Sequence, residues 1–396
     1  MPVTTIAVIV ALPTYLAFAP TYSWLQRRYA RLGRGRRPIP SPEPYLPDVD
    51  VIVPCYNEEP ALLAACLRSL ARQDYKGEMR VWVVDDGSRN LEDLRPVLEE
   101  ETDLDRRVVL LDGNRGKREA QAAALLQGRG EVVVTVDSDT SIEPDGIRQL
   151  VAWLRDSEVG AVTGNLRASN ADATWLTRLI DTRYRLLFER ERAAQGFFGA
   201  VLCCAGPFSA YRRAAVEGVL DEYLGQRFWG RRRVCGDDLK LTNLILADGY
   251  RSEFAPAAMA TTDVPTTPRR FVRQQLRWNR SFYRELPGML RLLPGRSRYL
   301  ALDLVSRTLL PALSFVAVAA TAVDALFAPS GVPDGLGALA LMALATLPLG
   351  QSLASAAGRQ FALGYGLVFL VLLLPTRLWA ASTLFRNCWG TRGPRG

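Results

Sequence analysis

Short apolar runs alternate with amphipathic stretches through the first part of the chain. The runs are rich in valine and cover residues 49–53, 81–84, 108–111, 132–136 and 159–164. Residues 62–70 and 119–126, which lie between runs, have apolar positions at helical spacing. β-Strands that alternate with helices are typical of a parallel sheet. We therefore predict an α/β domain with a parallel sheet over residues 48–267.

Polar and acidic residues follow the ends of four of these runs. Ligands bind outside the carboxyl ends of the strands in open α/β sheets, so these four loops should converge on one acidic mouth. Such a mouth suits a divalent cation that carries a phosphorylated ligand, because Mg²⁺ is commonly shared between carboxylates and phosphates. The loops are Pro54-Cys55-Tyr56-Asn57-Glu58, Asp85-Asp86-Gly87-Ser88, Asp112-Gly113-Asn114-Arg115-Gly116-Lys117 and Asp137-Ser138-Asp139-Thr140.

The hydropathy pattern changes at both ends of this domain. Residues 1–25 are apolar, which predicts an N-terminal transmembrane helix. They precede an arginine- and proline-rich stretch, 26–47, which we interpret as a basic linker. The positive-inside rule then places the α/β domain in the cytosol and the N-terminus outside. Residues 268–298 are basic and amphipathic, which favours a helix in the headgroup plane, although a helix packed on the core remains the alternative.

Residues 299–396 contain three apolar blocks. The first two, 299–327 and 336–356, are long enough to span a bilayer, whereas Pro375 and Arg377 interrupt the third, 361–385. We predict that the third block is interfacial or re-entrant and that the basic C-terminus stays in the cytosol. The sequence thus predicts a multi-pass protein of the cell membrane.

Composition narrows the chemistry. The net charge of +8 comes largely from arginines that flank the apolar segments, which favours anionic lipid over nucleic acid as the partner. The chain has no histidine, so a general base must be a carboxylate, Lys, Tyr or Cys. The six cysteines show no zinc-binding spacing, and we expect them to be buried and reduced.

Individual residues suggest roles in binding a nucleotide. Asp137 and Asp139 follow a strand and can turn toward one cation. Asp85 and Asp86 are either a structural turn or, beside Asn57 and Glu58, a contact for a nucleoside. The ring of Tyr56 can stack on a base, and Lys117 supplies a point charge for phosphate.

Two later motifs suggest the transfer chemistry. Asp237 and Asp238 precede a predicted helix, where Asp is favoured as an N-cap, and Asp238 is also our candidate general base. Gln274, Arg277 and Trp278 follow at helical spacing. Arginine can hold a diphosphate through paired hydrogen bonds, and an indole gives a stacking surface for a sugar.

In this order, Asp85-Asp86, Asp137-x-Asp139, Gly236-Asp237-Asp238 and Gln274-x-x-Arg277-Trp278 resemble the processive glycosyltransferases of family 2. Two branches are similar to the chain in different places. Residues 170–204 resemble rhizobial chitooligosaccharide synthases. Gly236-Asp237-Asp238, Leu241-Thr242-Asn243, Thr262-Asp263-Val264-Pro265, Arg277-Trp278-Asn279 and Trp389-Gly390-Thr391-Arg392 resemble hyaluronan synthases.

This resemblance implies a GT-A (Rossmann-like) fold joined to an α-helical transmembrane region, UDP-sugar donors, and Mg²⁺ or Mn²⁺ held by Asp137 and Asp139. Asp238, with Asp237 beside it, would be the base, and Tyr56, Asn57, Glu58, Asp85, Asp86, Lys117, Asp137, Gln274 and Arg277 would bind the donor. Trp278, Cys204 and Gly206 would contact the acceptor, and Trp389 and Arg392 would border a channel entrance. The first expectation is a hyaluronan synthase that uses UDP-GlcNAc with UDP-GlcA and moves the growing polysaccharide through the bilayer. The alternative is a chitooligosaccharide synthase that uses UDP-GlcNAc alone, or a glycosyltransferase that makes a single transfer to a lipid. A catalytically inactive membrane partner is a third hypothesis.

Overall fold

The computed structural model describes residues 3–101, 103–232, 236–327 and 368–386. The chain forms two compact units. The smaller unit consists of Met1–Arg28 and Leu293–Ser382, and the larger unit consists of Tyr29–Leu292 and Thr383–Gly396.

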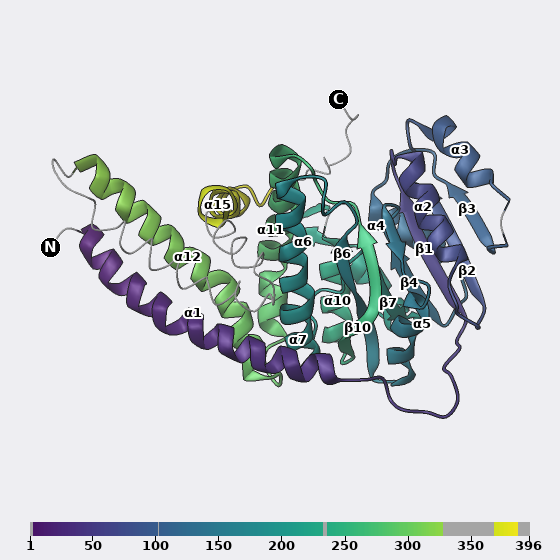
Figure 1. Ribbon diagram of the computed structural model, residues 1–396, viewed down its shortest axis with the longest axis horizontal. Helices are drawn as coiled ribbons and strands as arrows, with labels where there is room; N and C mark the ends of the chain where they lie inside the picture. Colours follow the sequence, from purple (N-terminus) through teal and green to yellow (C-terminus); the bar gives the residue numbers. More distant parts are fainter. Residues whose placement is uncertain (1–2, 102, 233–235, 328–367, 387–396) are drawn as a thin grey trace. The chain divides into compact units, whose positions relative to one another are not determined.

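One twisted sheet organises the larger unit (Figure 1). Its strand order is β3-β2-β1-β4-β7-β6-β10-β5. The inner strands are buried because their β-branched side chains fill both faces of the sheet. The strands are β1 (Val49–Cys55), β2 (Met79–Asp85), β3 (Arg106–Leu110), β4 (Val132–Val136), β5 (Thr140–Ile142), β6 (Val159–Ala168), β7 (Phe208–Arg212) and β10 (Arg251–Thr262).

The sheet is mixed rather than parallel, which corrects the prediction. Strands β3, β2, β1 and β4 are parallel neighbours, as expected. However, β7 inserts between β4 and β6 and runs antiparallel to both, and β5 is antiparallel to β10. The apolar pattern of a strand indicates which of its faces are buried but not the direction in which it runs. The pattern therefore could not predict that β7 is antiparallel to its neighbours.

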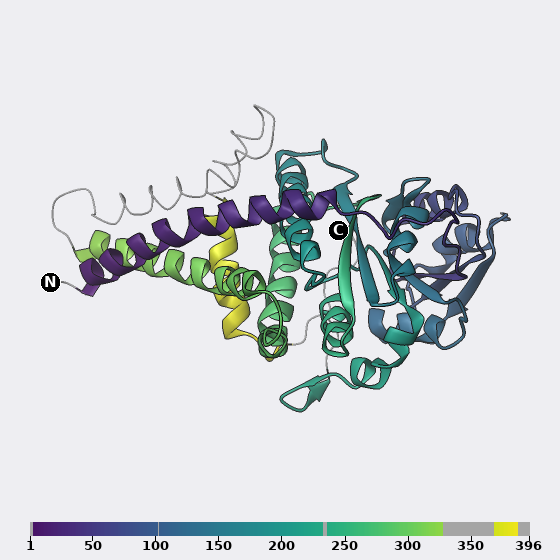
Figure 2. The same cartoon turned by 90° about the horizontal axis from the view of Figure 1, so that it is seen from below.

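Helices cover the sheet. Thr174 caps α6 with a capping box, so the helix begins at Trp175. A π-helical turn, η2 (Leu187–Arg192), separates α6 from α7. The helices are α2 (Pro60–Ala71), α3 (Leu91–Glu99), α4 (Lys117–Leu125), α5 (Gly146–Val151), the 3₁₀ turn η1 (Ala152–Arg155), α6 (Trp175–Leu186), α7 (Ala193–Phe197), α8 (Arg213–Glu217), α9 (Leu220–Leu224), α10 (Asp237–Ala247) and α11 (Pro268–Arg291). Figure 2 shows the short hairpin of β8 (Arg227–Phe228) and β9 (Arg231–Arg232) projecting from this unit.

The smaller unit is helical. It contains the first part of α1 (Val3–Gly35), α12 (Arg298–Phe327), the π-turn η3 (Phe369–Leu373) and α15 (Leu374–Ser382). Helix α1 continues to Gly35, so residues 26–35, which we predicted to be linker, are helical. Among the described residues, one stretch, Arg298–Val316, has the length and apolar composition needed to cross a membrane. Residues 336–356 lie outside the described part, so the multi-pass arrangement is not confirmed.

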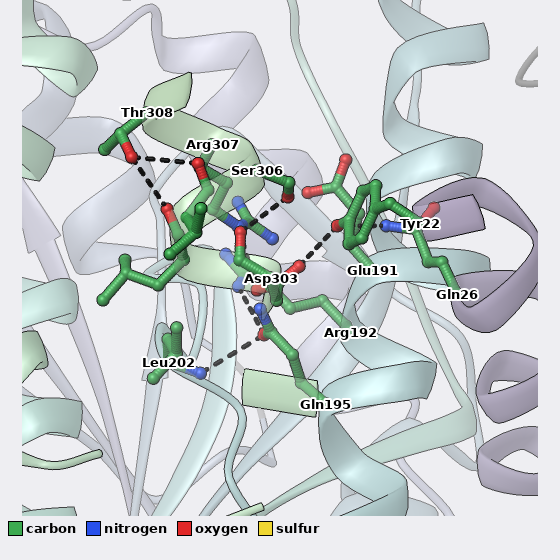
Figure 3. A network of polar contacts seen from close by, with 12 residues as sticks. Tyr22, Gln26, Glu191, Arg192, Gln195, Leu202, Asp303, Ser306, Arg307 and Thr308 are labelled. Atoms are coloured by element: carbon green, nitrogen blue, oxygen red, sulfur yellow. Dashed lines mark hydrogen bonds and ion pairs between the residues drawn. The ribbon is translucent and has the colours of Figure 1, made fainter. Parts of the chain in front are cut away.

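A buried carboxylate joins α1 to α12 (Figure 3). Asp303 accepts hydrogen bonds from the Tyr22 hydroxyl at 2.5 Å and from Arg307 Nε at 3.0 Å. Gln26 donates to the same Tyr22 hydroxyl at 2.8 Å. A charge inside an apolar helix needs such partners, and the donors Tyr22 and Arg307 keep Asp303 compatible with its burial.

Candidate active site

The loop after β2 contains two carboxylates with different surroundings. Asp86 accepts two backbone hydrogen bonds, whereas one oxygen of Asp85 accepts none from the described residues. Asp86 accepts the backbone N–H groups of Arg115 and Gly116 at 2.7 and 2.8 Å, which fixes the turn before α4. Burial raises the pKa of the Asp86 carboxyl, and these two donors oppose the rise. Asp85 Oδ2 accepts the Ser88 N–H, whereas its buried Oδ1 has no hydrogen-bond partner among the described residues.

The loop after β1 lies against the loop after β2. Asn57 adopts the left-handed conformation, with φ of +48°, which Asn tolerates better than most residues. Its N–H donates to Ser88 Oγ and its Oδ1 accepts the Arg89 N–H, both at 2.8 Å. Tyr56 beside it is half-buried. Asp85, Asn57 and Tyr56 therefore share one region, as the sequence predicted.

Glu58 connects this region to the Asp137–Asp139 loop. Its Oε2 accepts the Ser138 hydroxyl at 2.6 Å, and its Oε1 accepts the N–H of Glu59 at 3.0 Å. The Glu58 side chain is buried. It is thus placed to fix the relative position of two loops rather than to contact a ligand directly.

Lys117 occupies the centre of the acidic mouth. Its ammonium forms an ion pair with Asp137 Oδ1. Burial opposes the charge of this lysine, but Asp137, Asp238 and Asp237 together keep its pKa above the usual value. A Cβ added to Gly206 would lie 2.8 Å from Lys117 Nζ and 3.8 Å from Asp238 Oδ2. Three residues that are far apart in sequence therefore meet around Gly206.

Asp139 and Asp137 offer hard oxygen ligands at the end of β4. Asp139 Oδ1 accepts the Thr262 hydroxyl at 3.2 Å. No group of three or more acidic or thiol side chains gathers as a preformed metal site among the residues that the structure describes. Two carboxylates nevertheless fit Mg²⁺ or Mn²⁺, since phosphate oxygens commonly complete the shell of such ions. The donor set therefore fits the expected cation.

Tyr184 of α6 is a neighbour of this pair that the sequence did not reveal. Its pKa is raised by burial and by the charges of Asp139 and Asp137, and Arg277 opposes the rise. The phenol therefore lies within electrostatic reach of both carboxylates and of the arginine in α11. Tyr184 and Arg277 are far apart in the sequence, so no local sequence signal could have predicted that Tyr184 lies near the site.

Asp237 and Asp238 begin α10 but have different surroundings. Asp238 is partly exposed, and its Oδ2 accepts the Gly206 N–H at 3.3 Å. Asp237 is buried and pairs with Arg118 at 2.6 Å. The sequence predicts a catalytic role for both. The structure gives Asp238 access to the mouth, while the Asp237 carboxylate is enclosed by Arg118.

The segment before β7, which contains Cys203 and Cys204, also lies near Asp238. Cys204, expected at the acceptor, is fully buried, and its N–H donates to Thr242 of α10 at 2.9 Å. Its side chain therefore cannot contact an acceptor. Cys203 is mostly buried but retains some exposure, and burial together with the nearby Asp238 raises the pKa of its thiol. The thiol consequently stays protonated.

Helix α11 carries the last motif. Gln274, Trp278, Ser281 and Glu285 recur at intervals of three or four and so share one face of the helix. Ser281 lies against Gly236, where an added Cβ would be 2.8 Å from the serine Cβ. Trp278 is 39% exposed, and the buried Gln274 Oε1 has no hydrogen-bond partner among the described residues. This face therefore borders the start of α10.

Two buried arginines of α11 hold the chain just after α15. Arg280 donates to Thr383 Oγ1 at 2.8 and 3.1 Å. Arg284 donates to the carbonyl oxygens of Leu384 and Arg386 at 2.6 to 2.9 Å. Trp389 and Arg392, predicted at a channel entrance, lie outside the described residues.

The chain matches the family model described as "Glycosyltransferase like family 2" over residues 47–281. It is 43% identical to an N-acetylglucosaminyltransferase of Sinorhizobium fredii over 97% of this chain and 94% of the relative. It is also 43% identical to an N-acetylglucosaminyltransferase of Rhizobium meliloti, over 96% of this chain and 90% of the relative. The chain therefore belongs to glycosyltransferase family 2, and it is an enzyme of that family.

A solved structure supports the fold. A mannosyltransferase from Pyrobaculum calidifontis, in complex with GDP-Man and Mn²⁺, aligns with a TM-score of 0.69. The match covers 96% of this chain and 98% of that one at 24% identity. The predicted GT-A-like fold is confirmed.

Proposed function

We propose that the chain transfers N-acetylglucosamine from UDP-GlcNAc to a growing chitooligosaccharide. The observation that carries this proposal is the near full-length similarity to proteins named N-acetylglucosaminyltransferases, joined to an acidic mouth that contains Asp238. These relatives favour the alternative over hyaluronan synthesis, which was our first expectation.

The donor would lie across the loops after β1, β2 and β4. The unpaired Oδ1 of Asp85 is a suitable acceptor for the imide N–H of uracil, because a buried carboxylate oxygen without a donor is costly. Tyr56 would stack on the base, and Lys117 would exchange Asp137 for a diphosphate oxygen. Gln274 and Arg277 would approach the diphosphate from α11.

Asp137 and Asp139 would hold Mg²⁺ or Mn²⁺. Such an ion supplies Lewis-acid stabilisation of the negative charge that develops on the departing diphosphate. Lys117 forms an ion pair with Asp137 and so holds this carboxylate at the mouth.

Asp238 would be the general base. Its carboxylate takes the proton from the acceptor hydroxyl while that oxygen attacks the anomeric carbon from the face opposite the diphosphate. The new C–O bond forms as the bond to UDP breaks, and UDP leaves with the electron pair, so the configuration inverts. The Gly206 N–H orients the carboxylate, and Trp278 would stack on the acceptor sugar.

The apolar and basic segments that flank the active-site domain favour a membrane enzyme whose larger unit faces the cytosol. Arg298–Val316 is a candidate span, and α11 just before it is basic and amphipathic. We keep the predicted domains: an N-terminal apolar segment at 1–25, a basic linker at 26–47 shortened by α1, the GT-A domain at 48–267, the α11 segment at 268–298 and a C-terminal membrane region at 299–396. Extrusion of the oligosaccharide across the bilayer would follow from this layout.

Labelled donors test the product directly. Membranes that contain the full chain are supplied with radiolabelled UDP-GlcNAc alone, with UDP-GlcA alone, and with both. We expect chitinase-sensitive oligosaccharides from UDP-GlcNAc alone, unchanged by UDP-GlcA, and none from membranes carrying Asp238→Asn. A polymer that forms only when both donors are present would overturn the proposal in favour of hyaluronan synthesis.

A further inference from the structure

Two pairs of consecutive residues meet at the base of the mouth. Helix α4 begins with Lys117 and Arg118, and α10 begins with Asp237 and Asp238. Lys117 turns toward Asp137 and Gly206, near Asp238. Arg118 turns the other way and pairs with Asp237 at 2.6 Å. The second contact is enclosed, since the side chains of Arg118 and Asp237 are only 5% and 7% exposed.

Arg118 also reaches further elements. Its guanidinium donates to Gln226 Oε1 at 2.5 Å and lies 5.0 Å from the ring centre of Tyr223. Gln226 in turn donates to Glu285 of α11 at 2.6 Å. Glu285 lies on the face of α11 that carries Trp278. One buried guanidinium thus connects the starts of α4 and α10 with α9, the chain before β8, and α11.

We propose that Arg118 and Asp237 are positioning residues that fix the first turn of α10, so that Asp238 faces Gly206 and the acceptor. This inference rests on the proposed function, because it assigns Asp238 the role of base. Two backbone groups orient the Asp238 carboxylate: the Leu239 N–H donates to Oδ1 at 2.9 Å within the first turn of α10, and the Gly206 N–H donates to Oδ2 at 3.3 Å. Asp238 directly follows Asp237 in the chain. The enclosed Arg118–Asp237 ion pair therefore fixes the backbone from which the Asp238 side chain extends.

The proposal also assigns different tasks to the two aspartates. Asp237 is committed to Arg118 and shielded from an acceptor hydroxyl. Asp238 is left as the carboxylate that can take a proton. Arg118 would act through geometry, since a misplacement of about 1 Å can cost on the order of 10²-fold in rate.

Four variants of the full chain separate positioning from stability: Arg118→Met, Arg118→Lys, Asp237→Asn, and the double variant Arg118→Met/Asp237→Asn. Removing one partner leaves a buried charge unpaired, whereas removing both does not. Each variant is assayed for kcat, donor KM and Tm with UDP-GlcNAc. Arg118→Lys keeps the charge but not the planar fork that reaches both Asp237 and Gln226.

We expect kcat to fall on the order of 10²-fold in Arg118→Met, with donor KM within about threefold of wild type. Arg118→Lys should recover part of the loss. The double variant should regain the Tm lost by Arg118→Met while its kcat stays low. A double variant with wild-type kcat would overturn the proposal, as would a loss in Arg118→Met that matches the loss of folded protein.

The proposed function is tested separately. Wild-type turnover of UDP-GlcNAc and inactivity of Asp238→Asn support it. If both are observed and Arg118→Met turns over at the wild-type rate, only the positioning role of Arg118 is refuted.

Discussion

Gly206 is the position where a single methyl group should disturb catalysis without disturbing the fold. A Cβ at this residue would lie 2.8 Å from Lys117 Nζ and 3.8 Å from Asp238 Oδ2. The second distance is an ordinary contact, but the first is too short. The far end of the lysine side chain can move away at little cost, so Gly206→Ala should fold normally.

The size of the effect follows from that distance. Non-bonded atoms of this kind prefer about 3.5–4.0 Å, so Nζ must retreat by roughly 1 Å. The retreat weakens the ion pair with Asp137 and removes charge from the place proposed for the diphosphate. We therefore expect donor KM to rise several-fold and kcat/KM to fall by roughly 10- to 100-fold, because geometric errors of this size are costly.

Steady-state kinetics with UDP-GlcNAc and a thermal melt check this expectation. Gly35→Ala is the matched control, because a Cβ at Gly35 meets nothing within 4 Å. The control should match wild type in both assays. If Gly206→Ala retains wild-type kcat/KM, or if its Tm falls in parallel with its activity, the reasoning about Lys117 is refuted.

Two other predictions concern the acidic residues. Asp238→Asn should lower kcat by on the order of 10²–10⁴ while UDP-GlcNAc still binds in equilibrium titration; turnover at the wild-type rate would remove Asp238 as the base. EDTA should abolish transfer and Mg²⁺ or Mn²⁺ should restore it, and Asp139→Ala should weaken donor binding, because Asp139 is proposed to hold the ion that bridges protein and diphosphate. Full activity in chelator would contradict the metal assignment.

The parallel half of the sheet was predictable because its signals are local. Residues 132–136 form β4 with the predicted bounds, and the other three runs match β1, β2 and β3 to within two residues. The β-branched side chains of β1, β2 and β4 suit strands buried on both faces, whereas β3 lies at the edge of the sheet and is more exposed. The polar residues that follow them converge for the same reason, since parallel strands end at one edge.

The remaining errors come from information that is not local. The pattern of residues 208–212 could not reveal a strand that runs antiparallel between two others. The sequence singled out Lys117 but not Arg118, because adjacent basic residues look equivalent until helix α4 turns them to opposite sides. Cys204 was misplaced because the chain before β7 turns its side chain inward, whereas the neighbouring Cys203 keeps some exposure.

Helix α11 is hydrogen-bonded to the chain after α15, and these bonds affect how a water-soluble version of this enzyme could be made. The family match ends at residue 281, which invites a truncation near Leu292. Such a cut would delete Thr383, Leu384 and Arg386, whose oxygens accept from Arg280 and Arg284. Both arginine side chains are 5% exposed, so the shortened protein would have to hydrate or expel them. A better design would omit the intervening helices but return residues 383–386 through a flexible tether.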